Sequence, residues 1–279
     1  MLRHFRLAWL GLVPFLVFIT AFELLPLGGL VLSAFSDGGG PSVVNFVRAA
    51  RPAIVTAFAN STGLSLATAL LGTAVGLVIA YLVQTSRSRR WRNVVTALST
   101  VTASFGGAPL AFAFIIALGS TGMITMLLGL VGIDLYPGFR IYSVTGLIVA
   151  YLYFQIPLAV LLLLPSVQGL KREWREAATS LGADGRAYWL RVGLPLLRPS
   201  IASCFCLLFA NAFGAYATAW TLTGSSVELV TVQIAALIRG EVQLDPALAD
   251  AIAVLSMLVM AAAIWLQRLF ARRQGMASR

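Results

Sequence analysis

Long apolar runs alternate with short polar intervals along this chain, and the runs have the length of helices that cross a membrane. The hydrocarbon core of a bilayer is about 30 Å thick, so a spanning helix needs about 20 apolar residues. The runs are Leu7–Phe35, Ile54–Val83, Val94–Leu118, Ile141–Leu164, Ile201–Leu222 and Ala247–Phe270. The pattern predicts an all-α protein, a polytopic membrane bundle of six transmembrane helices.

The first run, Leu7–Phe35, is longer than the apolar core of a cleaved secretory signal, which has roughly 7–15 residues. We therefore expect an uncleaved spanning helix, bent at Pro14 and Pro26. Glu23 is the one charged residue of the run. It is either a functional carboxylate within the membrane or a residue near the outer water interface.

Three further features modify the predicted helices. The second run carries small residues at every fourth position (Thr68, Gly72, Gly76 and Ala80), which would let another helix approach closely. The third run is expected to be loosened by Gly106, Gly107 and Pro109. Between the third and fourth runs, Met123–Leu130 could form a short interfacial helix.

The longest polar interval, Pro165–Pro199, predicts two short helices joined by a glycine. Apolar residues recur from Leu170 with the 3.6-residue spacing of a helix that has one apolar face: Trp174, Ala177, Ala178 and Leu181. Gly182 stands where a helix C-terminus favours a residue with positive φ. Asp184 can cap a second short helix, which Gly193 and Pro195 are expected to terminate. A helical hairpin on a polar loop indicates a docking surface.

Composition and charge agree with a membrane protein and give it an orientation. Apolar residues make up 59% of the chain and charged residues 11%, a balance that excludes an ordinary soluble domain. The net charge of +10 does not require nucleic acid as a partner, since sixteen of the twenty Lys and Arg residues lie on the termini and on the two basic loops 86–92 and 165–199. Because positive residues collect in cytoplasmic loops, both termini are predicted to be cytoplasmic.

Motifs for catalysis and for ATP binding are absent from the sequence. The single histidine, His4, lies in the N-terminal segment, and Cys204 and Cys206 lie inside an apolar run, so a metal site or a membrane-embedded enzyme has little support. No G-x-x-x-x-G-K-[ST] motif is present, so any ATP would be bound by a separate subunit. The alternative is a stand-alone carrier driven by an ion gradient, for which Glu23 and Asp250 are the candidate carboxylates. Both lie close to span ends.

The polar interval resembles the EAA signature of ABC importer permeases. That signature is E-A-A-x3-G-x9-I-x-L-P, and this chain has Glu176-Ala177-Ala178, Gly182, Val192 and Leu194-Pro195, with Val in place of Ile. The resemblance implies the type I ABC importer permease fold, and it implies that this loop couples the chain to an ATPase. Together with Trp174 and Leu181, the matching residues form the predicted coupling site.

Further expectations follow from this resemblance. The partners would be a dimer of ABC ATPase subunits, a second permease subunit (identical or different), an external solute-binding protein and the lipid bilayer. The chain itself would be neither an enzyme nor the holder of a cofactor. Residues 1–53 would form an N-terminal helix and external loop, and 54–279 the permease core in a bacterial-type inner membrane.

The fifth run contains a second resemblance, since Phe209–Gly224 is similar to permeases of the spermidine/putrescine-type subgroup. This suggests a polyamine-like solute, although the subgroup also carries iron and phosphonate. Polar residues of the fourth and fifth runs are candidates for the translocation path: Asn211, Tyr216, Thr218, Tyr151 and Gln155. The alternative for each of them is a hydrogen bond between helices, worth about 0.6 kcal/mol.

Overall fold

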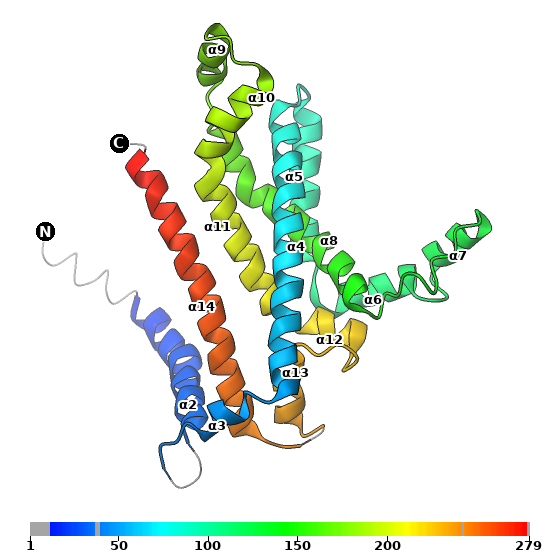
Figure 1. The fold of residues 1–279 in the computed structure, drawn as a ribbon, viewed down its shortest axis with the longest axis vertical. Coiled ribbons are helices and arrows are strands. Elements are labelled where there is room, and N and C mark those ends of the chain that lie inside the picture. The colour runs from blue at the N-terminus through cyan, green and yellow to red at the C-terminus, as the bar shows by residue number, and fades with distance from the viewer. Residues whose placement is uncertain (1–11, 37–39, 242, 278–279) are drawn as a thin grey trace, which may run out of the picture. The chain divides into compact units, whose positions relative to one another are not determined.

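The computed structural model describes residues 12–36, 40–241 and 243–277, and within these ranges the chain is helical with no named strand. Six helical segments are long and apolar enough to cross a membrane (Figure 1). They are Leu12–Ala34, Pro52–Thr85, Gly107–Leu130, Val144–Gln168, Gly185–Phe213 and Pro246–Leu269. The prediction of an all-α membrane bundle with six spans is confirmed. Residues 7–11 of the first predicted span lie outside the described residues.

The chain divides into two compact units. The first consists of Met1–Thr56 and Gln233–Leu258, and the second of Ala57–Val232 and Val259–Arg279. Helices α4 (Pro52–Thr85), α13 (Val230–Arg239) and α14 (Pro246–Ala277) contribute residues to both units.

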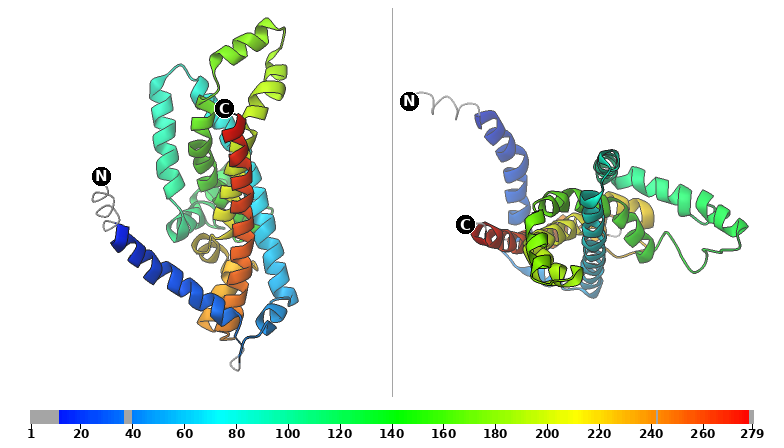
Figure 2. Two further views of the ribbon diagram at one scale, coloured as in Figure 1. Left: turned by 90° about the vertical axis from the view of Figure 1, so that its left-hand side faces the viewer. Right: turned by 90° about the horizontal axis from the view of Figure 1, so that it is seen from above.

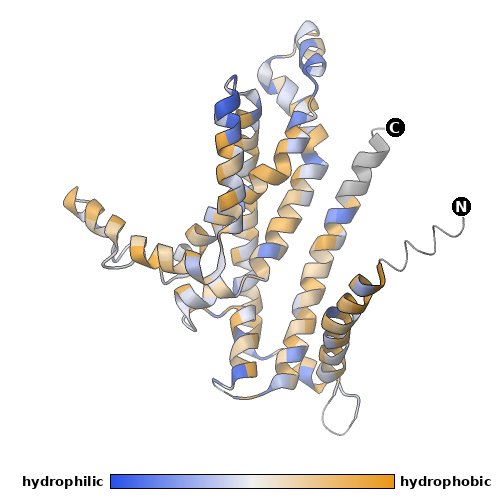
Figure 3. Cartoon of the chain, turned by 180° about the vertical axis from the view of Figure 1, so that it is seen from behind, coloured by the Kyte–Doolittle hydropathy of each residue, from blue (hydrophilic) through white to orange (hydrophobic). Residues whose placement is uncertain are grey.

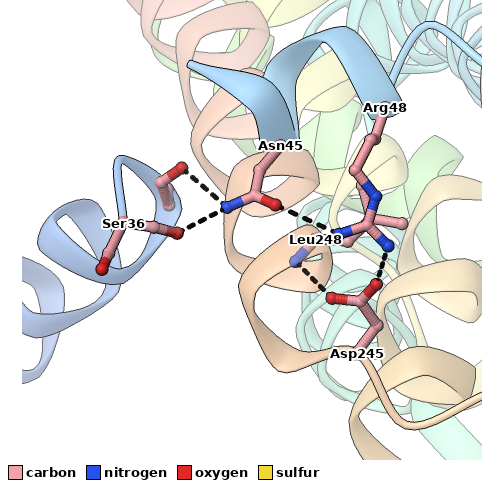
Figure 4. A network of polar contacts seen from close by, with 6 residues as sticks. Ser36, Asn45, Arg48, Asp245 and Leu248 are labelled. Carbon is pink, nitrogen blue, oxygen red and sulfur yellow. Dashed lines mark hydrogen bonds and ion pairs between the residues drawn. The ribbon is translucent and has the colours of Figure 1, made fainter. Parts of the chain in front are cut away.

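A polar network holds the first unit together at the end of α2 (Leu25–Ala34), α3 (Val44–Arg48) and the start of α14 (Figure 4). The buried amide of Asn45 donates to the carbonyl of Ser36 at 2.9 Å and accepts from the Arg48 guanidinium at 3.3 Å. Arg48 in turn forms an ion pair with Asp245. The second carboxylate oxygen of Asp245 accepts from the Leu248 N–H at 3.2 Å and so caps α14.

The second unit is a bundle whose centre is α8 (Val144–Gln168). Helices α5 (Arg89–Ser104) and α11 (Leu194–Phe213) pack against α8, and α6 (Gly107–Leu118) packs against α12 (Ala217–Thr223). Buried side chains of α8 form part of a continuous apolar cluster with residues of α6 and α12: Leu110, Leu147, Tyr151, Phe154, Ala219 and Leu222. The short helix α7 (Met123–Leu130) packs on α6 and extends away from α8 and α11 (Figures 1 and 2), and its bounds match the short helix predicted there.

Two glycines of α4 permit its close approach to α8. A Cβ atom built on Gly76 would lie 2.4 Å from the Cβ of Ala159, and one on Gly72 would lie 3.3 Å from Gln155. The predicted stripe of small residues therefore has a definite neighbour, the middle of α8.

Two helices widen into a π turn just before a proline. Proline cannot donate a backbone hydrogen bond, and its ring collides with the carbonyl four residues earlier. The π segments Thr20–Leu24 and Trp189–Gly193 each end two residues before a proline, Pro26 and Pro195. In both, the residue before the proline donates to the carbonyl five residues earlier, so the helix continues past the proline without breaking.

The third predicted span, Val94–Leu118, is wrong as a single helix. The structure ends α5 at Ser104 and begins α6 at Gly107, and the long apolar segment is Gly107–Leu130. Gly106 is extended and Gly107 has φ +73°, a conformation that favours glycine. The pair that was expected to loosen the helix divides it.

The fifth predicted span, Ile201–Leu222, also has different bounds. Helix α11 already begins at Leu194 and ends at Phe213, and α12 follows after a break at Gly214–Tyr216. The early start follows from the π turn, which carries the chain past Pro195. Helix α13 lies between the fifth and sixth predicted runs, where the pattern predicts no spanning helix.

The α4–α8 contact generates a prediction. Gly76→Ala should lower the free energy of unfolding by about 1–3 kcal/mol, because the new methyl group meets a Cβ atom and backbone that cannot give way. The measurement is the thermal midpoint of the detergent-solubilised protein, taken as the temperature at which half of its monodisperse peak is lost in size-exclusion chromatography.

Gly63→Ala is the matched control, since Gly63 lies on the same helix with open space around it. That change should leave the midpoint equal or slightly higher, because alanine is the better helix former by about 1 kcal/mol. Equal midpoints for the two variants would contradict the close helix contact.

Candidate functional site

The segment after α8 forms the helix–glycine–helix predicted from the sequence. Helix α9 (Arg172–Ser180) ends in a Schellman turn: Ala183 N–H donates to the Ala178 carbonyl and Gly182 N–H to the Thr179 carbonyl, each at 2.9 Å. Gly182 has φ +81°, which is the left-handed conformation that glycine adopts at no steric cost. Asp184 then caps α10 (Gly185–Tyr188) by accepting from Ala187 N–H at 2.7 Å, as predicted.

Helix α9 presents its apolar side to solvent. The side chain of Leu181 is 88% exposed, and Trp174 is also exposed, with the Lys171 ammonium 5.8 Å from the centre of its ring. Ala177 is exposed and Ala178 is half-buried. Among the described residues, α10 is the element that packs against α9. An amphipathic helix whose apolar side is exposed within the described part of the chain is suited to binding a partner protein.

Glu176, the acidic residue of the motif, pairs with its own helix. Its carboxylate accepts from Arg172 Nε at 2.8 Å, and both side chains are largely exposed. An exposed pair of this spacing contributes only about 0.3–0.5 kcal/mol. Glu176 can therefore exchange this partner for another cation at little cost.

The second half of the segment is anchored, unlike the first. Trp189 packs edge-on against Tyr81 of α4 with 4.8 Å between ring centres, and Tyr188 is buried. A Cβ atom on Gly193 would lie 2.7 Å from the Trp189 ring, so this glycine makes room for the tryptophan. The expectation that Gly193 and Pro195 terminate the second short helix is wrong. The π turn Trp189–Gly193 joins α10 to α11 without interruption, and α11 begins with Leu194 and Pro195.

A cavity of about 270 Å³ lies at the two helix breaks of the second unit. Three of the five predicted path residues line it, Asn211, Tyr216 and Thr218. The other lining residues are Ala103, Ser104, Gly106, Gly107, Phe154, Ala215 and Ala217. None of these residues is charged.

Two of the predicted path residues form hydrogen bonds between helices: Thr218, which also lines the cavity, and Tyr151. Thr218 Oγ1 donates to the Gly107 carbonyl at 3.2 Å and accepts from the Gly107 N–H at 3.0 Å. Tyr151 OH donates to the Ala215 carbonyl at 2.9 Å, beside the break after α11. These contacts agree with the alternative of interhelical hydrogen bonds, and they shape the wall of the cavity.

The fifth path candidate, Gln155, lies away from the cavity lining. It is fully buried against α4 and donates to Thr68 Oγ1 at 3.3 Å. Its Oε1 has no hydrogen-bond partner among the described residues and faces Gly72. Asn211 is the candidate whose amide is exposed and forms no hydrogen bond within the described chain.

Sequence patterns do not predict Ser104 and Phe154 as cavity residues, and at Gly106 and Gly107 they predict only a loosened helix. Adjacent glycines ahead of Pro109 were the available signal. Within the described ranges, no group of three or more His, Cys, Asp or Glu side chains could hold a metal ion.

Comparison with known families gives a match over most of the chain. A family model described as "Binding-protein-dependent transport system inner membrane component" matches residues 72–275. The match includes the helical hairpin of α9 and α10 and the whole cavity lining.

Individual relatives are similar over shorter stretches. The thiamine transport system permease protein ThiP of Salmonella typhimurium is 30% identical over 130 residues, which are 47% of this chain and 24% of that protein. The probable sulfate transport system permease protein cysT of Nephroselmis olivacea is 28% identical over 214 residues, 75% of this chain and 71% of that protein. The match to the thiamine protein thus spans about a quarter of its length.

A solved structure has the same fold. A chain of a bacterial ABC transporter involved in the import of the acidic polysaccharide alginate superposes with a TM-score of 0.76, at 17% identity, over 97% of this chain and 96% of that one. At this identity the likeness establishes the arrangement of helices, that of an ABC importer permease.

The hydrogen bonds at the helix break generate a prediction. Thr218→Val keeps the shape of the side chain but removes the Oγ1 that accepts from the Gly107 N–H, which should cost about 1–3 kcal/mol of folding free energy. The thermal midpoint in detergent should fall by several degrees.

Thr221→Val, on the same helix, is the control, since the Thr221 hydroxyl forms no hydrogen bond among the described residues. Its thermal midpoint should change little, because a substitution at a neutral site alters the free energy of unfolding by no more than about 0.5 kcal/mol. An equal loss in both variants would show that the Thr218 bridge does not stabilise the break.

Proposed function

We propose, because this chain belongs to the family of binding-protein-dependent transport system inner membrane components, that it is the permease subunit of an ATP-driven importer of a small solute. The observation that carries the proposal is the helical hairpin of α9 and α10. It matches the EAA signature in sequence, and the apolar side of α9 is exposed on a segment that lies between two spans. The chain would supply the passage, and a separate subunit would hydrolyse ATP.

The hairpin would transmit a movement of the ATPase to the membrane-spanning helices. Its free half, α9, would dock on the ATPase through Trp174, Ala177, Ala178 and Leu181. Its other half, α10, continues as an unbroken helix into α11 and is fixed to α4 by the Trp189–Tyr81 contact. A displacement of α9 would therefore reach the residues of α11 and α12 that line the cavity. This supports alternating access driven by closure of two ATPase subunits.

The orientation follows from the basic residues. The N-terminal end of α5, with Arg89, Arg90 and Arg92, and the α9–α10 hairpin lie at the same end of the second unit (Figures 1 and 3). By the positive-inside rule this end faces the cytoplasm, and so do both termini. The opposite side would receive solute from an external binding protein. A second permease subunit, identical or different, would complete the passage, with residues 1–53 as an extra helix ahead of the core 54–279.

The solute that we propose is small and polar. A polyamine is the candidate that the Phe209–Gly224 resemblance suggests. The relatives named for thiamine and sulfate transport do not support this narrower choice. The path residues in this proposal are Asn211, Tyr216 and Thr218, with Tyr151 and Gln155 behind them as bonds between helices.

The coupling role is tested by substitutions in the turn after α9 that leave the membrane-spanning helices unchanged. Gly182→Val places a β-branched residue at φ +81°, a left-handed conformation that costs such a residue about 1–2 kcal/mol or more. Co-purification of the ATPase subunit and ATP-dependent uptake in proteoliposomes should therefore both fall by at least about tenfold. Leu181→Asp should have the same effect without strain, because that side chain is exposed. Membrane insertion should be unchanged in both.

Gly182→Asn is the matched control, because asparagine tolerates the left-handed conformation better than other non-glycine residues. It should retain most of the co-purification. Unchanged ATPase binding in Gly182→Val would refute the assignment of this loop. Uptake that survives ATP depletion but fails with an uncoupler would instead identify a carrier driven by an ion gradient.

A further inference from the structure

Helix α5 has three different faces, although it is a single helix of 16 residues. One face packs against α8 and includes the buried Ser99. A second face is apolar and exposed, with Trp91, Val94, Leu98 and Val101 at alternating spacings of three and four residues. A third face carries Asn93, Thr96, Thr100 and Ser104, which are exposed or half-buried. Each residue advances about 100° around a helix, so the three faces lie roughly a third of a turn apart.

The hydroxyl groups of the third face are arranged in a ladder. Thr96, Thr100 and Ser104 each donate to the carbonyl four residues earlier, at 2.8, 2.9 and 2.9 Å. A carbonyl oxygen has no hydrogen to give, so the hydroxyl hydrogen is committed in every case. The lone pairs that remain on the three oxygens can only accept hydrogen bonds.

This hydroxyl ladder is continuous with the cavity. Ser104, its last member, lines the cavity together with Asn211, Tyr216 and Thr218. From there the ladder follows α5 towards the arginine-rich N-terminus of the helix. The cavity end is also the C-terminus of α5, where the helix dipole places partial negative charge.

We infer that the hydroxyl ladder of α5 is the wall of the inner half of the passage, and that it favours solutes carrying hydrogen-bond donors. The inference rests on the proposed function. Lipid would cover the apolar face of α5, since polar groups in membrane proteins face the bundle interior or a water-filled cavity. Ammonium, amide and hydroxyl groups can bind a row of acceptor oxygens, whereas a fully ionised oxyanion offers such a wall no donor.

Thiol labelling distinguishes the two exposed faces. Thr100→Cys and Ser104→Cys lie on the ladder, and Leu98→Cys and Val101→Cys are the matched controls on the apolar face, 60% and 68% exposed in the native chain. The native Cys204 and Cys206 are buried, so the parent protein gives the baseline. In inside-out membrane vesicles, sulfonatoethyl methanethiosulfonate should label the ladder positions at least about tenfold faster than the controls, because thiols react as water-accessible thiolates.

A second reagent tests the preference for donors. Aminoethyl methanethiosulfonate carries N–H donors, and its rate at Thr100→Cys relative to the sulfonatoethyl reagent should exceed the same ratio for free cysteine by about five- to tenfold. The comparison is made in 0.5 M salt, where the Debye length is only about 4 Å and the arginines at the end of α5 are screened. The Leu98→Cys protein controls for reagent that crosses the lipid.

Equal labelling of the two faces would overturn the assignment of the wall, and a ratio equal to or below that of free cysteine would overturn the solute class. Labelling needs neither ATP nor an ATPase. Loss of the coupling role with intact ladder labelling would therefore count against the proposed function alone. Normal ATPase coupling with no difference between the faces would count against the hydroxyl ladder alone.

Discussion

Backbone hydrogen bonding is the constraint on which the structure of this bundle depends. Inside a membrane no water is available to satisfy a free N–H or carbonyl, so a helix can stop there only where protein groups replace the missing bonds. The chain interrupts α5–α6 and α11–α12, and side chains from the facing elements satisfy the freed groups. Thr218 bonds both backbone groups of Gly107, and Tyr151 bonds the Ala215 carbonyl. The cavity lies where these two breaks meet, with Thr218 of α12 bonded to the first break and Tyr151 of α8 bonded to the second.

The same residues would therefore serve both stability and the proposed passage. A hydroxyl that bridges two broken helices fixes the cavity wall, but it has little hydrogen-bonding capacity left for a solute. The side chains that remain available are Asn211 and the oxygens of Ser104 and Thr100. In the proposed passage, the bridging groups would fix the wall, and the available groups would contact the solute.

The sequence predicted the elements better than their ends. Hydrophobic run length was sufficient for six spans, and the spacing of Trp174, Ala177 and Leu181 was sufficient for α9. At Gly106–Gly107 the sequence predicts only a loosened helix, because the cost of a full break depends on whether a residue 111 positions away can bond the free backbone. The sequence alone does not predict that Gln155 bonds α4 or that Asn211 is exposed. Which helix a side chain faces depends on the tertiary packing of the helices. The prediction that Pro195 terminates a helix is wrong because the rule for prolines assumes α geometry, and the π turn removes that assumption.

The two π turns also determine rotational phase. A π turn is an α-helix with one residue added, and one residue corresponds to about 100° of rotation around the axis. The turn at Trp189–Gly193 thus sets the direction in which the α9–α10 hairpin points relative to the faces of α11. A relative that lacks one residue here would present its hairpin a quarter turn or more away, even if every motif residue were kept. Alignments that place a single-residue gap between Trp189 and Pro195 would then mark pairs of permeases whose ATPases cannot be exchanged.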